Sequence, residues 1–259
     1  MKKIVLISLL VALVAGCTAK KFLYDLNLPD QQMELSSKLN EISGLVLLSD
    51  SVLAAVQDEK GRVYYLDAHT GKIRNHFDFA KNGDYEGVAH HKSHFYVLRS
   101  DGTIFKVKPN KKAKEYTFKN NKNFDFEGLC VDVANNRLLV ACKTHGTKKK
   151  RDHFYIYAFS LVTNSFESDP VFKIKRDEVD SDFKPSGIAI HPKGHIYILS
   201  SYSKSLLVLS AKGKIINHTY LDPSIFYQPE GITFNSSGDL FISNEKNDQI
   251  PTVLIFKRK

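Results

Sequence analysis

Glutamate stands directly before glycine and an aliphatic residue at three widely separated places in this sequence. The clearest copy centres on Glu127-Gly128, and Glu86-Gly87 and Glu230-Gly231 repeat it. Carboxylates that share one site raise one another's pKa, because a like charge disfavours ionisation. A hard cation resolves that conflict, and calcium accepts about six to eight oxygen ligands from carboxylates, carbonyl groups and waters. The motif therefore indicates a cation site, provided that the fold brings its copies together.

Two looser copies of the motif carry serine in place of glutamate, at Ser43-Gly44 and Ser186-Gly187. The five glycines follow one another at spacings of 43, 41, 59 and 44 residues. A period of about 40 residues, built from short strands without helical stretches, is typical of a β-propeller. Each glycine is expected where the chain enters the innermost strand of a blade, in a conformation or close approach that a side chain would prevent. We therefore predict an all-β fold, a five-bladed β-propeller with four strands in each blade.

The strand pattern also predicts how the propeller ring closes. The last repeat offers only three strands, between residues 231 and 256. A strand near residues 31–35, before the first repeat, is expected to supply the fourth, because an open sheet edge would otherwise remain. The third repeat is longer than the others by about fifteen residues, partly in the lysine-rich stretch 144–152 and partly in 177–184. We interpret the basic stretch as a solvated insertion rather than a partner-binding loop.

Composition places the chain among soluble globular proteins. Hydrophobic residues make up 42% and charged residues 25% of the sequence, enough to bury a sizeable core. The formal net charge is +9, which is compatible with an anionic partner. The lysines are scattered, however, and the sequence contains no nucleic-acid-binding motif. We expect a monomer that binds no nucleic acid and whose excess of lysines is exposed to solvent.

The N-terminus has the pattern of a bacterial lipoprotein signal. Lys2-Lys3 is followed by an apolar run, 4–14, that is too short to span a bilayer, and then by Val14-Ala15-Gly16-Cys17, which resembles a lipobox. We predict a signal peptide at 1–16, a lipidated tether at 17–23 and the propeller at 24–259. Acyl chains on Cys17 would anchor the protein to the membrane. An ordinary secretory signal with a chance cysteine is the alternative.

The location of the anchored protein follows from the residue after the cysteine. Thr18 occupies that position, and by similarity to bacterial sorting rules a residue other than Asp points to the outer membrane of a Gram-negative host. We expect a protein of the cell envelope that faces the periplasm or the exterior.

The remaining cysteines, Cys130 and Cys142, fall on adjacent predicted strands of one hairpin. We favour two buried thiols over a cross-strand disulfide, whose geometry is often strained. Neither residue belongs to a CxxC motif or shows zinc-type spacing, so a cysteine metal site is not expected.

The motifs, a Leu28-Pro29 lead-in and the sequence from Ile242 to Glu245 together resemble the SdiA-regulated, YjiK-like family of bacterial β-propellers. The resemblance covers roughly residues 24–256. It implies a five-bladed propeller, calcium at a shared site and no established reaction. Some members carry an acid after the second strand of several blades. The present sequence matches that pattern at Asp58-Glu59 and Asn244-Glu245 but departs from it at Arg99-Ser100, Lys143-Thr144 and Ser200-Ser201.

The innermost strands of a propeller line a central channel, so the motif glutamates are expected to face one another there. The sequence provides five candidate calcium ligands: Glu41, Glu86, Glu127, Glu230 and Glu245. Magnesium fits less well because it requires a stricter octahedron. Zinc is disfavoured because histidine is scarce in the motifs. Alternatively, each glutamate accepts backbone N–H bonds from the next blade and holds the blades together without an ion.

Asp58, Arg99 and Lys143 are candidate ligand-binding residues at the same end of the channel. We expect a lipid-anchored propeller that binds calcium and serves as a binding module for a small molecule, a glycan or an envelope protein. The alternative is a calcium-dependent hydrolase of a phosphoester or lactone, because the motifs also resemble those of phytase-like and gluconolactonase-type propellers. Calcium would then polarise the substrate oxygen while Glu86 positions water. A third alternative is a structural scaffold for an envelope complex.

Overall fold

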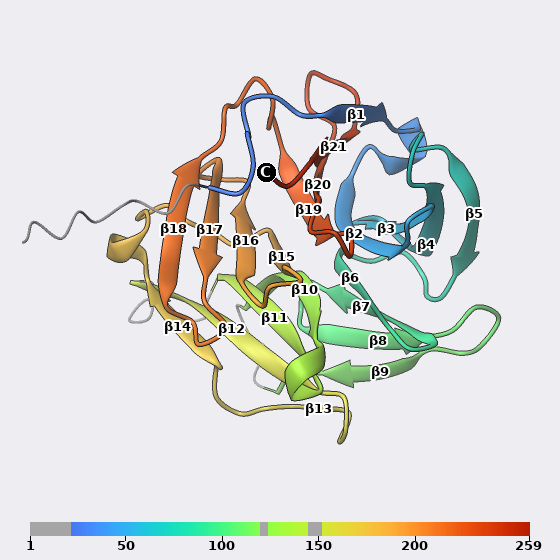
Figure 1. Cartoon of the computed structure of the whole chain (residues 1–259). Helices are drawn as coiled ribbons and strands as arrows, with labels where there is room; N and C mark the ends of the chain where they lie inside the picture. Colours follow the sequence, from blue (N-terminus) through green and yellow to red (C-terminus); the bar gives the residue numbers. More distant parts are fainter. Residues whose placement is uncertain (1–21, 120–123, 145–151) are drawn as a thin grey trace, which may run out of the picture.

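Runs of β-branched and aromatic residues alternate with short turns along the chain, and each run forms a strand in the computed structural model, which describes residues 22–119, 124–144 and 152–259. The strands make five antiparallel sheets arranged in a ring (Figure 1). This confirms the predicted five-bladed propeller. The predicted signal peptide, Cys17 and the tether up to residue 21 lie outside the described residues.

The first two blades follow the chain order from the inner strand to the outer strand. Blade one consists of β2 (Ile42–Ser49), β3 (Val52–Gln57), β4 (Lys60–Asp67) and β5 (Ile73–Asp78). Blade two consists of β6 (Tyr85–His91), β7 (His94–Arg99), β8 (Thr103–Val107) and β9 (Lys114–Thr117).

Blade three is the long repeat, and its outer strand is split. It contains β10 (Asp125–Asp132), β11 (Arg137–Thr144) and β12 (His153–Ser160), with β13 (Ser165–Phe166) and β14 (Phe172–Lys175) pairing with opposite ends of β12. Residues 145–151 of the lysine-rich stretch 144–152 lie outside the described residues. The second long stretch is packed against the fold, because Phe183 is fully buried and stacks on Phe154 at 5.0 Å between ring centroids.

The last two blades complete the ring. Blade four contains β15 (Gly187–Ile190), β16 (Ile196–Ser200), β17 (Ser205–Leu209) and β18 (Ile215–Tyr220). Blade five contains β19 (Pro229–Phe234), β20 (Leu240–Asn244), β21 (Thr252–Phe256) and the N-terminal β1 (Gln31–Glu34). Short 3-10 turns occur at η1 (Ser37–Leu39), η2 (Val133–Asn135) and η4 (Arg176–Glu178). No helix in the described parts of the chain is long and apolar enough to cross a membrane.

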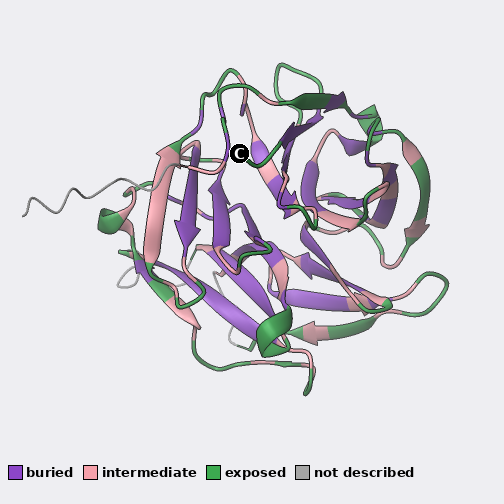
Figure 2. Cartoon of the chain, viewed as in Figure 1, coloured by how far each residue is buried: buried purple, intermediate pink, exposed green. Residues whose placement is uncertain are grey.

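Burial follows the position of a strand within its blade (Figure 2). Every residue of β16, β17, β20 and β21 is buried, whereas the outer strands β5, β9 and β18 have no buried residue. The middle strands are sandwiched between neighbouring blades, so both of their faces are apolar. The core therefore lies between the blades.

β1 closes the ring as predicted. Gln31 pairs with Ile255 and Glu34 with Thr252, in an antiparallel register along β21. Met33 and the following Leu35 are buried in the apolar cluster between blades five and one. The strand therefore covers the free edge of β21 and also fills the gap between the first and last blades.

The motif glycines allow the inner strands to approach one another closely. A Cβ atom at Gly87 would lie 2.8 Å from the Cβ of Leu129 in the next blade, and one at Gly231 would lie 2.8 Å from the Cβ of Leu45. Real Cβ atoms do not approach other atoms so closely. The close-approach part of the glycine prediction is confirmed, whereas positive φ angles occur at other glycines, such as Gly102 and Gly213.

Both remaining cysteines are free thiols, as favoured from the sequence. Cys130 lies opposite Leu139 and Cys142 opposite Phe126 in the β10–β11 ladder, so the two sulfurs are not cross-strand partners. Burial raises the pKa of both thiols, to about 12 for Cys142. They therefore stay protonated at neutral pH and contribute to packing.

The ring closure is tested by truncating one buried side chain of β1. Met33→Ala should lower the free energy of unfolding by about 2–4 kcal/mol, because a buried side chain that contacts two blades is lost. Gln32→Ala, on the exposed face of the same strand, is the matched control and should change it by less than about 0.5 kcal/mol. Equal effects in urea unfolding would show that β1 does not stabilise the closed ring.

Candidate functional site at the propeller axis

The five copies of the motif meet at one constriction of the central channel. Its walls come from the motif residues of all five inner strands, and its volume is only about 10 Å³. We call the three carboxylates that line it, Glu86, Glu127 and Glu230, the axial cluster. The fold thus brings together the three Glu-Gly copies that the sequence singled out.

The two serine copies of the motif join the blades. The Ser43 hydroxyl donates a hydrogen bond of 2.5 Å to the carbonyl of Tyr85, in the next blade. The Ser186 hydroxyl donates one of 3.1 Å to the carbonyl of Pro229, again in the next blade. Both acceptors directly precede a glutamate of the axial cluster. Serine therefore serves the blade-joining role that was considered for glutamate, and it fixes the backbone before Glu86 and Glu230.

Glu127 is the most deeply buried of the three axial glutamates, with 6% of its surface exposed. Its Oε1 forms an ion pair with the Nζ of Lys143, which lies on β11 of the same blade. The side chain of Lys143 is 36% exposed, so it reaches the cluster from a partly open position. Lys143 was predicted as a ligand-binding residue, and in the structure it binds an axial glutamate.

The axial glutamates lack sufficient positive charge around them. Burial, with help from the charge of Glu127 and from Asp84, raises the pKa of Glu86 to about 10. Burial and the charge of Glu230 raise the pKa of Glu127 to about 8, although Lys143 opposes the shift. Burial raises the pKa of Glu230 to about 7, while Lys143 and Ser201 limit the increase. A cation of greater charge would stabilise all three carboxylates.

A second acidic group, the flanking cluster of Glu41, Asp58 and Glu245, lies between blades five and one. Burial, then a hydrogen bond with Glu41, raises the pKa of Glu245 to about 9. Gln228 donates a hydrogen bond of 2.5 Å to Glu245. Burial and the charge of Glu41 raise the pKa of Asp58 to about 6. The charge of Glu230 also raises the pKa of Glu245, so the two clusters interact electrostatically.

Arg99 is held within its own turn. Its guanidinium donates to both carboxylate oxygens of Asp101, at 2.8 and 3.1 Å, and to the hydroxyl of Thr103 at 3.3 Å. It also lies over the ring of Phe105. Of the three predicted ligand-binding residues, Lys143 contacts the axial cluster and Asp58 belongs to the flanking cluster, whereas Arg99 is bound to Asp101.

Sequence reasoning missed several groups that shape the site. Asp84 and Asp125 each stand two residues before an axial glutamate, and the charge of Asp84 raises the pKa of Glu86. The repeated Asp-aromatic-Glu-Gly pattern was a signal that could have identified them. Lys204, whose Nζ donates to the carbonyl of Ser201 at 2.7 Å, lies near Glu230. Lys204 lies in a turn that contains no copy of the motif, so the sequence did not indicate that it is near the site.

The donor set suits a hard cation, because its charged groups are carboxylates. In the present side-chain arrangement, however, no three His, Cys, Asp or Glu residues among those described converge closely enough to hold a metal ion. The Lys143 ammonium group instead neutralises Glu127. Calcium therefore fits the chemistry of the site, and its binding would require side chains to rearrange.

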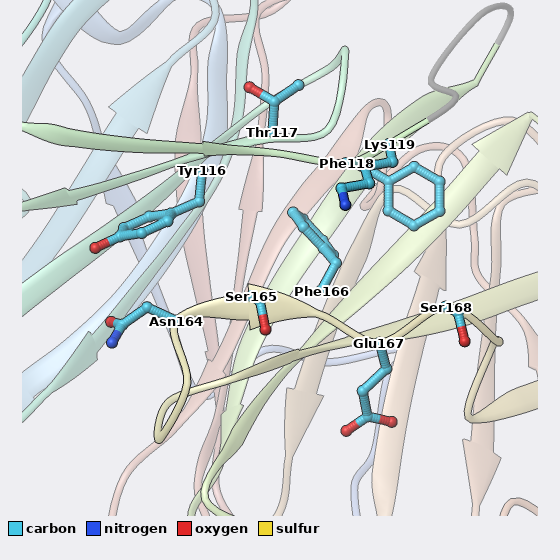
Figure 3. A pocket seen from close by; sticks show the side chains of 9 residues that line it. All are labelled: Tyr116, Thr117, Phe118, Lys119, Asn164, Ser165, Phe166, Glu167 and Ser168. Carbon is cyan, nitrogen blue, oxygen red and sulfur yellow. The ribbon is translucent and has the colours of Figure 1, made fainter.

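Two other cavities lie apart from the axial cluster. His90 lines a wider cavity of about 310 Å³ at a different level of the channel, where most of the lining residues are aliphatic. A groove of about 590 Å³ lies between the outer strands β9 and β13, where Phe118 and Phe166 face each other (Figure 3). Neither cavity is lined by an acidic residue of the axial or flanking cluster.

A comparison of the sequence with protein families finds a match. The profile of the SdiA-regulated family matches residues 21–248, which is most of the chain. The chain belongs to the SdiA-regulated family. This confirms the resemblance noted from the motifs. A comparison with curated proteins finds no match.

Solved structures with the same fold include several propellers of low sequence identity to this SdiA-regulated protein. Myxococcus xanthus glutaminyl cyclase is 14% identical, with a TM-score of 0.62, covering 89% of this chain and 95% of that one. A chain of a nidogen/laminin complex is 14% identical, with a TM-score of 0.55, covering 78% and 72%. A luciferin-regenerating enzyme is 11% identical, with a TM-score of 0.52, covering 86% and 94%. At these identities the similarity establishes the fold alone.

The crowding of acids predicts a specific pH dependence. The pKa of Glu86 is 4.5 in the unfolded chain and about 10 in the folded protein, so protonation favours folding. That stabilisation is complete below pH 4.5 and is lost as the pH rises toward 10. In chelator at pH 8, Glu86→Gln should raise the free energy of unfolding by about 1–2 kcal/mol. The two proteins should differ little at pH 5.

Glu115→Gln, on the exposed outer strand β9, is the control for the loss of a carboxylate and should show no such pH-dependent gain. Urea unfolding at both pH values measures the effect. If Glu86→Gln is no more stable than the natural protein at pH 8, the axial carboxylates are not crowded in solution.

Proposed function

We propose that this SdiA-regulated propeller is a non-enzymatic binding protein of the bacterial cell envelope whose axial cluster binds calcium. The observation that carries the proposal is the convergence of Glu86, Glu127 and Glu230 from three blades at one constriction, with every carboxyl pKa raised. A bound divalent ion would supply the missing positive charge. It would also join three blades that otherwise repel one another at the axis.

The nearby groups favour calcium over other common metals. The carboxylates and serine hydroxyls at the constriction are oxygen ligands, which calcium accepts in variable number and geometry. Zinc prefers nitrogen and sulfur ligands, and His90 lines the wider cavity and not the constriction. Glu41, Asp58 and Glu245 of the flanking cluster are further oxygen donors beside the axial cluster.

Binding is favoured over hydrolysis because the basic groups of the site are already engaged. A calcium-dependent hydrolase of phosphoesters or lactones would benefit from a cation free to hold the developing anion. Arg99 is paired with Asp101, and in the metal-free arrangement Lys143 is paired with Glu127. We therefore propose that calcium organises a binding surface for a small molecule, a glycan or an envelope protein.

Calcium binding is tested by thermal unfolding of a soluble fragment, 18–259, after removal of metals with a chelator. Calcium at about 100 times its dissociation constant should stabilise the fragment by about 2.7 kcal/mol, and magnesium should stabilise it less. Glu127→Gln and Glu230→Gln should remove most of the calcium effect, whereas Glu115→Gln should retain it. A calcium shift that survives both axial substitutions would place the ion elsewhere.

We also propose that Cys17 anchors the protein to the envelope, with the outer membrane as its destination. The proposal is supported by the lipobox-like sequence 14–17 and the preceding apolar run. Cys17→Ser should abolish labelling by a fatty-acid precursor and release the protein from the membrane fraction, because single-residue lipidation supplies the anchor. Cys130→Ser is the control and should leave both unchanged. Membrane retention of an unlabelled Cys17→Ser protein would refute the anchor.

A further inference from the structure

Lys143 stands near the end of β11, the second strand of blade three, and its ammonium group turns inward to Glu127. Burial lowers the pKa of Lys143, but Glu127 raises it, and the charges of Asp125 and Glu230 add smaller contributions in the same direction. A positive charge built into the chain thus lies among the carboxylates proposed to bind calcium.

Other cations around the axis make different contacts. Arg99 is bound by Asp101, and the Nζ of Lys204 donates to the carbonyl of Ser201. Among the ion pairs of the described residues, the one with Lys143 is the only one that includes an axial glutamate. Lys143 therefore has a direct contact with the proposed metal ligands.

We propose that Lys143 is an internal competitor that sets the affinity of the axial cluster for calcium. The inference rests on the proposed function, since it concerns the same carboxylates. When calcium binds, Glu127 exchanges the lysine ammonium group for the metal ion, and the lysine swings toward solvent. Its partly exposed, flexible side chain permits this movement without a change in the backbone.

The exchange has a predictable effect on the affinity for calcium and on how that affinity depends on salt concentration. Calcium must displace the Lys143 ammonium group, and an ammonium group that stays close to the bound ion repels it. The natural chain should therefore bind calcium weakly and with a clear dependence on salt concentration. Removing the charge should strengthen binding by about tenfold or more, since even a screened unit charge at a few ångströms has an effect of this size.

The test compares calcium binding by the metal-stripped natural protein and three variants, using isothermal titration calorimetry. Lys143→Met removes the charge and keeps the length of the side chain, whereas Lys143→Arg keeps the charge. Lys212→Met, in the exposed turn between β17 and β18, controls for the loss of any lysine. We expect about tenfold tighter binding for Lys143→Met alone. Affinities of Lys143→Arg and Lys212→Met should stay within about twofold of the natural value.

The possible results separate this inference from the proposed function. Equal calcium affinity in the natural protein and Lys143→Met would overturn the competitor role and leave calcium binding intact. Tenfold tighter binding in Lys143→Arg as well would also overturn it, because charge would not be the cause. Binding by Lys143→Met but not by the natural protein would support the competitor role and refute calcium binding by the natural chain. No binding by either would overturn both.

A second measurement uses the unsubstituted protein, in case Lys143→Met does not fold. Lysine acylation is followed by mass spectrometry with and without saturating calcium. Release from Glu127 should increase the labelling rate of Lys143 several-fold, while Lys212 stays constant. An unchanged rate at Lys143 under saturating calcium would overturn the exchange.

Discussion

The close approach of five inner strands around one axis is the constraint on which the rest of the structure depends. A side chain at the motif glycine would collide with the inner strand of the next blade, as the contacts of Gly87 with Leu129 and Gly231 with Leu45 illustrate. Only glycine gives the strands this spacing. The same spacing brings the preceding residues, glutamate in three blades and serine in two, to one narrow constriction.

The two residue types at that constriction have opposite consequences. Ser43 and Ser186 donate hydrogen bonds to backbone carbonyls of the next blade, so they stabilise the ring. Burial raises the pKa values of the glutamates, and the charges of neighbouring carboxylates add to the rise at Glu86 and Glu127. Lys143 partly offsets this cost at Glu127. The excess of carboxylates over positive charge at the axis therefore lowers the stability of the ring and also favours the binding of a cation.

Closure of the ring addresses a different problem, the free edge of the last blade. β1 pairs with β21, and Met33 enters the cluster between blades five and one. The axial cluster comes from blades two, three and five, and Glu230 belongs to the blade that β1 completes. The N-terminal strand therefore supports the geometry of the site from the outside of the ring.

The sequence by itself determined the fold, the five blades, the closing strand and the meeting of Glu86, Glu127 and Glu230. It did so because a repeated Glu/Ser-Gly-aliphatic motif with a fixed spacing specifies equivalent positions in a ring. Only the tertiary structure decided how the charged groups pair. Lys143 and Arg99 occupy similar positions at the ends of the second strands β11 and β7, yet one reaches Glu127 and the other is bound by Asp101. The physical reason is that a long, flexible cationic side chain pairs with the carboxylate that lies nearest to it in the folded protein. The spacing of the repeats does not specify which carboxylate that is.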